Sequence, residues 1–124
     1  MNLESVKSIF ALFIGEDDIS TYVPFIQLAM TETEKMLLPD ADSSDIRLDF
    51  LTASIAAYRL RQAEASRDNS KYTYAGKMNS NSSNPALLYS ERMLRDYLTL
   101  CSDLISPKTF VFFGTSSGKE MIPC

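Results

Sequence analysis

The chain contains no histidine and only two cysteines, Cys101 and Cys124, among its 124 residues. Zinc sites are assembled mainly from histidine, cysteine and carboxylate ligands, so this composition argues against a zinc site. Two cysteines far apart in the sequence do not form a disulfide framework, which is typical of a protein from a reducing, cytoplasmic compartment. Without histidine, acid–base or nucleophilic catalysis has only surface carboxylates and lysines to use, so the residues do not favour an enzyme.

Long apolar runs are missing as well. No stretch approaches the ~20 apolar residues that a membrane-spanning helix needs. The opening residues, Met1 to Ser5, lack the basic stretch and following apolar run of a secretory signal. The length and a hydrophobic content of 45% instead predict one domain with one core.

The net charge of −4 is unevenly divided between the two parts of the chain. Residues 1–50 carry −7 and residues 51–124 carry +3. Such a division is compatible with an ordinary solvated surface. It is equally compatible with copies of the chain meeting head to tail, with an acidic face against a basic one.

Apolar residues at helical spacing predict a mainly α fold, beginning with two helices. The first runs over about residues 3–14, with Asn2 as its N-terminal cap and Gly15 at its C-terminal end. The second ends near Leu38. Because proline is tolerated only in the first turn of a helix, Pro24 indicates that its regular part begins near Thr21 or Tyr22.

A third helix is expected from about Ser44 to Ala65, with apolar residues on two opposite faces. One face holds Ile46, Phe50, Ala53, Ala57 and Leu60, and the other holds Leu48, Leu51, Ile55 and Tyr58. A helix with two apolar faces is covered on both of them. The expected fold is therefore a small bundle of four helices around this central helix.

The remainder is predicted as a polar loop, a fourth helix and a short strand. The loop, residues 66–84, is rich in Asn and Ser at its end, and loops of this length in compact domains are usually functional or disordered. Asn84 and Pro85 then begin the fourth helix, which extends to about Ser106. Thr109 to Phe113 has strong strand propensity. Residues 1–114 are expected to form one domain and residues 115–124 a flexible tail.

Two motif-like stretches do not match the patterns that they resemble. Gly114 to Lys119 has three residues between its glycines where a phosphate-binding loop has four, and Glu120 follows the lysine. The acidic stretch from Asp40 to Asp45 has no glutamate at the position where a calcium loop needs one. These patterns predict neither a nucleotide site nor a metal site, and no cofactor is expected.

Five features in order resemble the head–tail connector, or adaptor, proteins of tailed bacteriophages. They are a short opening helix ending in Ile14-Gly15, the acidic restart Glu16-Asp17-Asp18-Ile19, the alanine-rich helix Leu51 to Tyr58, the polar loop with Tyr74-Ala75-Gly76, and a final helix followed by the aromatic segment Phe110 to Gly114. The resemblance covers about residues 3–114 and is one of residue types. The chain departs from it at Pro24 and in the segment from Asn79 to Asn84.

The resemblance implies a structural protein of the virion neck, present in the host cytoplasm during assembly. Copies would bind beneath the portal protein as a ring, extend the DNA channel and dock the next neck or tail protein. DNA would be met only non-specifically in the channel, and no membrane would be involved. The expected contact residues, between subunits or with the portal, are Arg59, Arg67, Lys71, Tyr72, Tyr74, Phe110 and Phe112.

The same residues leave two alternatives open. The bases Arg59, Arg61, Arg67, Lys71 and Lys77, with Tyr72 and Tyr74 between them, are either a solvated helix end and loop or a surface that touches nucleic acid. A small helical regulatory or nucleic-acid-binding module is therefore the competing function. The aromatic segment 109–113 either pairs with residues 71–74 of its own chain or adds to a neighbouring copy.

Overall fold

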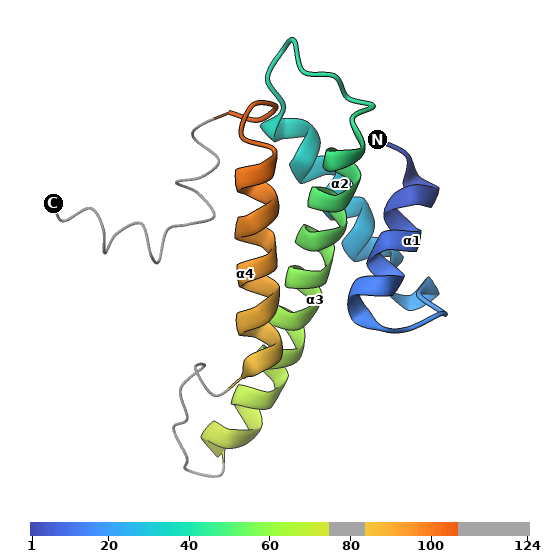
Figure 1. Cartoon of the computed structure of the whole chain (residues 1–124). Coiled ribbons are helices and arrows are strands. Elements are labelled where there is room, and N and C mark those ends of the chain that lie inside the picture. The colour runs from blue at the N-terminus through green and yellow to red at the C-terminus, as the bar shows by residue number, and fades with distance from the viewer. Residues whose placement is uncertain (75–83, 107–124) are drawn as a thin grey trace, which may run out of the picture.

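A computed structural model describes residues 1–74 and 84–106 (Figure 1). For residues 68–74 it describes the backbone only. This described part contains four α-helices and one 3₁₀ turn, namely α1 (Leu3–Ile14), η1 (Ser20–Tyr22), α2 (Val23–Met36), α3 (Ile46–Tyr74) and α4 (Pro85–Leu100). No β-strand occurs within residues 1–74 and 84–106. The prediction of a mainly α protein is confirmed.

Helix α1 begins and ends at the residues that the sequence predicted. The Asn2 side-chain oxygen accepts hydrogen bonds from the backbone N–H groups of Glu4 (2.8 Å) and Ser5 (3.3 Å). At the other end Gly15 has φ of +75°, a left-handed conformation that glycine adopts at little cost, and its N–H donates to the Ala11 carbonyl (2.9 Å). Local capping chemistry therefore fixes this element.

Helix α2 also starts where Pro24 requires. The chain passes through the 3₁₀ turn Ser20–Tyr22, and the α-helix begins at Val23, which puts Pro24 in its first turn. The helix ends at Met36, slightly before the predicted Leu38, because Leu37 is extended and forms an antiparallel bridge with Ile105. A contact with a distant part of the chain thus sets this boundary.

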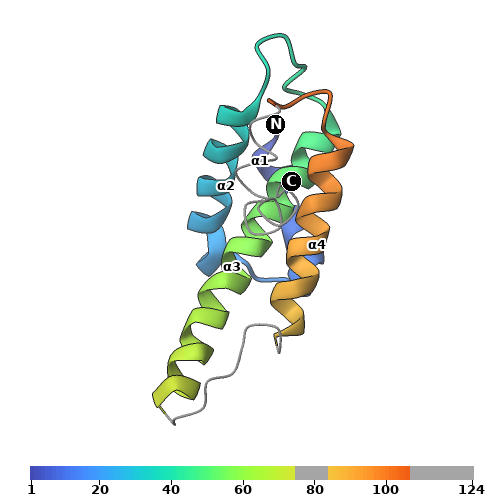
Figure 2. The ribbon, with the colours of Figure 1, turned by 90° about the vertical axis from the view of Figure 1, so that its left-hand side faces the viewer.

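Helix α3 is longer than predicted, because it continues beyond Ala65 to Tyr74. The prediction of a loop beginning at Ser66 is wrong for residues 66–74. The segment contains no glycine or proline, and the first residue that favours termination is Gly76, so polar composition alone did not stop the helix. In both ribbon views the C-terminal end of α3 extends past the start of α4 and beyond α1 and α2 (Figures 1 and 2).

Helix α3 is in contact with each of the other three helices. Every residue from Leu51 to Ala57 is buried, including the polar Thr52 and Ser54. These hydroxyls are satisfied locally, since Ser54 donates to the Leu51 carbonyl (2.7 Å) and Thr52 lies 2.7 Å from the Leu48 carbonyl oxygen and 2.9 Å from the Thr33 hydroxyl. The alanines among them let neighbouring helices approach closely.

Most predicted core residues of this helix are buried, namely Ala53, Ala57, Leu60, Leu51 and Ile55. Phe50 and Tyr58, which the sequence also placed in the core, are only partly buried, and Ile46, the first residue of α3, is 56% exposed. Phe50 nevertheless contacts the rings of Phe13 on α1 and Tyr97 on α4.

Helix α4 starts with Asn84, whose side chain accepts from the Leu87 N–H (3.1 Å), and ends at Leu100. It is shorter than predicted because residues 101–104 turn and Ile105 pairs with Leu37. The predicted strand at 109–113, the tail at 115–124 and the rest of the predicted loop, residues 75–83, lie outside the described residues.

Candidate assembly interface

Arg59, the first of the predicted contact residues, lies between α3 and α2. Its guanidinium forms an ion pair with Glu32 on α2 (2.5 Å) and donates to the Gln62 side chain (3.1 Å). The side chains of Arg59 and Glu32 are 24% and 21% exposed. Arg59 therefore joins two helices of its own chain.

Four other predicted contact residues belong to the part of α3 beyond Ala65. Arg67 is exposed, and Lys71, Tyr72 and Tyr74 follow it on the same helix. A helix displays them at fixed spacing, which the predicted loop would not have done. The two remaining contact residues, Phe110 and Phe112, lie outside the described residues.

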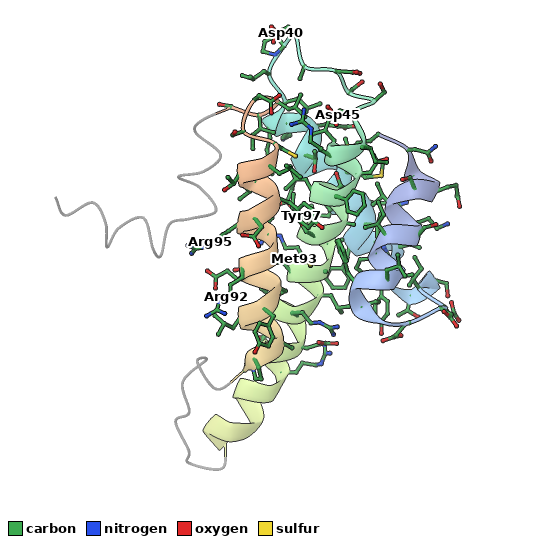
Figure 3. All side chains as sticks on the ribbon, in the orientation of Figure 1. Asp40, Asp45, Arg92, Met93, Arg95 and Tyr97 are labelled. Carbon is green, nitrogen blue, oxygen red and sulfur yellow. The ribbon has the colours of Figure 1, made fainter. Side chains whose placement is uncertain are left out.

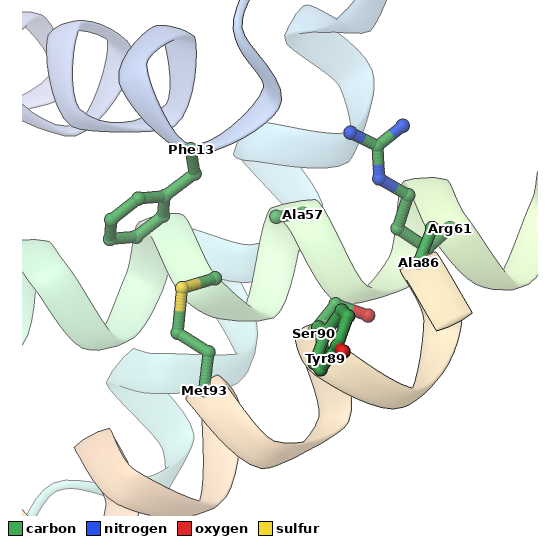
Figure 4. Close-up of a pocket in the computed structure, with 7 residues that line it drawn as sticks. All are labelled: Phe13, Ala57, Arg61, Ala86, Tyr89, Ser90 and Met93. Atoms are coloured by element: carbon green, nitrogen blue, oxygen red, sulfur yellow. The ribbon is translucent and has the colours of Figure 1, made fainter.

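A pocket of about 220 Å³ opens between α3, α4 and the end of α1 (Figure 4). It is lined by Phe13, Ala57, Arg61, Ala86, Tyr89, Ser90 and Met93. Arg61 is paired with Glu64 on the next turn of α3 (2.9 Å), and Ser90 donates to the Leu87 carbonyl within its own helix (2.9 Å). Arg61 and Ser90 are thus engaged within their own helices, and most of the remaining lining is apolar or aromatic.

Three aromatic rings, from α1, α3 and α4, meet beside this pocket. Phe50 on α3 stacks against Tyr97 on α4 with ring centres 5.8 Å apart, and Phe13 on α1 lies 5.9 Å from Tyr97 and 6.3 Å from Phe50. Figure 3 shows Tyr97 and Met93 on the side of α4 that faces α3. The rings tie α1 to α4 although those helices are far apart in sequence.

The opposite end of the helices is acidic and is organised by one arginine. Arg47 forms ion pairs with Asp45 (2.8 Å) and Asp103 (3.0 Å) and donates to the Leu100 carbonyl (3.0 Å). The hydrogen bonds from Arg47 hold the pKa of both carboxyl groups below the usual range. Arg47 therefore clamps the start of α3 to the end of α4.

A buried thiol lies behind this clamp. The Cys101 thiol is directed at the Arg47 carbonyl oxygen (3.4 Å), and burial raises its pKa to about 11. A thiol with so high a pKa is mostly protonated and unreactive at neutral pH, so it is a packing residue.

On one side of the molecule α2 and α4 flank α3, and no described helix lies over them (Figure 2). Tyr58 lies at its centre, and burial followed by the charge of Glu91 raises the pKa of the phenol. Glu91 pairs with Arg95 along α4 (2.9 Å). We call this surface the α2/α4 face, and its residues are Leu28, Glu32, Tyr58, Arg59, Gln62, Leu88, Glu91 and Arg95.

Leu28 and Leu88 form the apolar margins of the α2/α4 face. Leu28 is one helical turn before Glu32, and Leu88 is two turns before Arg95. Each leucine therefore lies on the same side of its helix as the charged residue. They are 49% and 39% exposed. The face therefore combines ion pairs at its centre with aliphatic side chains at two edges.

Within residues 1–74 and 84–106 no three cysteine or carboxylate side chains are grouped to hold a metal ion. Across the same residues, none of the helices combines the length and apolar character of a membrane span.

Sequence reasoning missed the Arg47 clamp and the Phe13–Phe50–Tyr97 cluster. Asp45 and Arg47 are close in sequence, but Asp103 is distant, and only the packing of α4 on α3 brings it near. The aromatic residues were each predicted to lie on a helix, yet helical spacing does not say which rings from different helices meet. No local signal could have identified either cluster.

In comparisons with known proteins, no family model, no curated protein and no solved structure matches this chain.

Proposed function

We propose that the protein is a structural head–tail connector of a tailed bacteriophage, without catalytic activity. It binds beneath the portal, assembles there as a ring, extends the DNA channel and docks the next neck or tail protein. The fold proposed for it is a bundle around α3, with residues 109–113 as a short C-terminal strand. The proposal rests on the ordered features of the sequence together with the arrangement of the described helices.

The observation that carries the proposal is the projection of α3 beyond the other helices. The segment from Ser66 to Tyr74 is polar and lies past the ends of α1, α2 and α4 (Figure 1). A short helix with no apolar stripe has little stability of its own, because most helical stability in proteins comes from packing. An arm of this kind is well suited to insert against a neighbouring protein.

The distribution of charge supports a contact between unlike ends of neighbouring copies. Asp40 and Asp42 are exposed in the loop that precedes α3, and Asp40 is seen at one extreme of the molecule in Figure 3. Arg67 is exposed on the projecting arm at the other extreme. A contact between different surfaces generates a ring when its rotation closes, and opposite charges favour and orient it.

The competing function, a nucleic-acid-binding module, receives less support from the same contacts. Arg59 and Arg61, two of the bases in the predicted cluster, each form an ion pair with a carboxylate of the chain. A phosphate would have to displace these carboxylates before it could be neutralised. Some of the bases in this cluster are therefore already neutralised by carboxylates of the same chain.

The direct test mixes the purified protein with DNA-filled heads that carry a portal but no neck. We expect binding at the portal vertex, seen by electron microscopy, and at least a tenfold weaker binding for Arg67→Glu. Lys35→Glu, the same charge reversal at an exposed residue of α2, is the matched control and should bind like the natural protein. Arg59→Glu is unsuitable because it removes the pair with Glu32.

Two results would overturn the proposal. One is absence of portal binding at every protein concentration. The other is tight binding of the isolated chain to a short DNA duplex, weakened steeply by salt and by Arg67→Glu, which would establish the nucleic-acid-binding module instead.

A further inference from the structure

The last described residues of the chain lie against the end of α2. The Leu38 N–H donates to the Leu104 carbonyl (3.0 Å), and the Ser106 N–H donates to the Met36 carbonyl (2.8 Å), on either side of the antiparallel Leu37–Ile105 bridge. The two segments run antiparallel at this point, so Ser106 is held beside Met36 at the end of α2. The residues that follow Ser106 start from this place.

The distance from this point to the α2/α4 face is short. Leu28 is two turns before Met36, or about 12 Å along the helix. Extended chain advances at most ~3.3–3.6 Å per residue, so Phe110 lies within ~14 Å of Ser106 and Phe112 within ~21 Å. The aromatic segment Thr109–Phe113 begins where the chain would reach the level of Leu28 and Glu32.

The composition of the segment matches that of the face. Phe110, Val111, Phe112 and Phe113 are four consecutive apolar residues, and Leu28 and Leu88 are exposed aliphatic side chains. Burying apolar area contributes roughly 25 cal/mol per Å². The guanidinium group of Arg95, at the edge of the face, is also suited to lie against an aromatic ring.

We propose that residues 109–113 pack on the α2/α4 face of their own chain, between Leu28 on α2 and Leu88 on α4, with Tyr58 beneath them. A tethered segment competes at a local concentration near the millimolar range, which favours the same chain over a second copy at ordinary protein concentrations. This inference does not depend on the connector function, because it requires only the described helices and the chain that follows them.

Disulfide trapping in the full chain tests the proposal. In a Cys124→Ser background, with buried Cys101 retained, single cysteines at 110, 111, 112 and 113 are paired in turn with Leu28→Cys and with Leu88→Cys. Mild oxidation should give an intramolecular bridge with at least one position for each partner, detected by mass spectrometry and by faster migration of the monomer without reductant. A bridge forms only when Cα atoms come within ~7 Å, so it reports proximity directly.

Leu12→Cys is the matched control, because Leu12 is 81% exposed on α1, which lies behind α3 in Figure 2. Its pairs should bridge at least tenfold less. Equal bridging with Leu12 and Leu28 would overturn the proposal. Bridged dimers in place of bridged monomers would also overturn it, and would identify a second copy as the occupant.

A stability measurement gives an independent answer. The double variant Leu28→Ser with Leu88→Ser should lower the melting temperature of the full chain by several degrees, because the segment loses its apolar support. Leu12→Ser should leave the melting temperature unchanged. An unchanged value for the double variant would contradict the proposal.

Discussion

Arg59 on α3 and Glu32 on α2 form an ion pair 2.5 Å long, across a sequence separation of 27 residues. The same two helices are also joined by the buried contact of Thr52 with Thr33. A residue that sequence reasoning assigned to contacts with other proteins is therefore used inside the fold.

The pairing of Arg59 with Glu32 predicts a measurable coupling free energy. Arg59→Gln and Glu32→Gln should each destabilise the protein, and the double variant should lose less than the two losses added together. Because both side chains are mostly covered, we expect a coupling of about 1 kcal/mol, at the upper end of values for surface pairs. Urea denaturation of the four proteins gives the value, and a coupling of zero would show that the pair does not stabilise the fold.

The complete burial of Ile55 predicts a large loss of stability on truncation. Ile55→Ala should lower the free energy of unfolding by ~2–5 kcal/mol, because a cavity is left in the interior of the protein. Leu12→Ala, at a side chain 81% exposed, should change it by less than ~0.5 kcal/mol. Similar effects at both positions would be incompatible with the packing of α3.

The extension of α3 predicts that helix content can be removed without loss of core stability. Ser70→Pro breaks the backbone hydrogen bonds of the projecting segment, so the circular dichroism signal at 222 nm should weaken while the melting temperature stays the same. Ser70→Ala is the control and should keep the signal. An unaltered spectrum for the proline variant would mean that residues 66–74 are not helical in solution.

The Arg47 clamp predicts a stability that depends on acid pH. The pKa values of Asp45 and Asp103 are lowered from 3.8 in the folded protein by hydrogen bonds from Arg47. For a lowered carboxyl pKa, the stabilisation is fully present above the unfolded value and is lost as the pH falls through the folded value. Asp103→Asn should therefore melt below the natural protein at pH 7, and the difference should shrink as the pH falls through the lowered pKa of Asp103.

A control separates this effect from general acid denaturation. Asp96→Asn removes an exposed carboxylate from α4 without touching the clamp. Its melting temperature should follow that of the natural protein at every pH. A difference for Asp103→Asn that persists unchanged at low pH would show that the charge of Asp103 is not the cause.

The sequence by itself determined the elements whose ends depend on local chemistry. Asn2 and Gly15 set the limits of α1, Pro24 the start of α2, and Asn84 the start of α4, because a cap or a proline acts on the backbone within a few residues. The spacing of apolar residues likewise identified Ala53, Ile55 and Leu60 as core residues.

Only the tertiary structure decided where helices end against distant chain and which side chains meet. The Leu37–Ile105 bridge ends α2, the packing of α4 brings Asp103 to Arg47, and Glu32 engages Arg59. The continuation of α3 past Ala65 was missed because polar residues are compatible with both loop and exposed helix, and no glycine or proline distinguishes them there. Contacts between residues far apart in sequence produce no regular spacing of residues along the chain. The candidate surfaces could therefore be identified only in the folded structure.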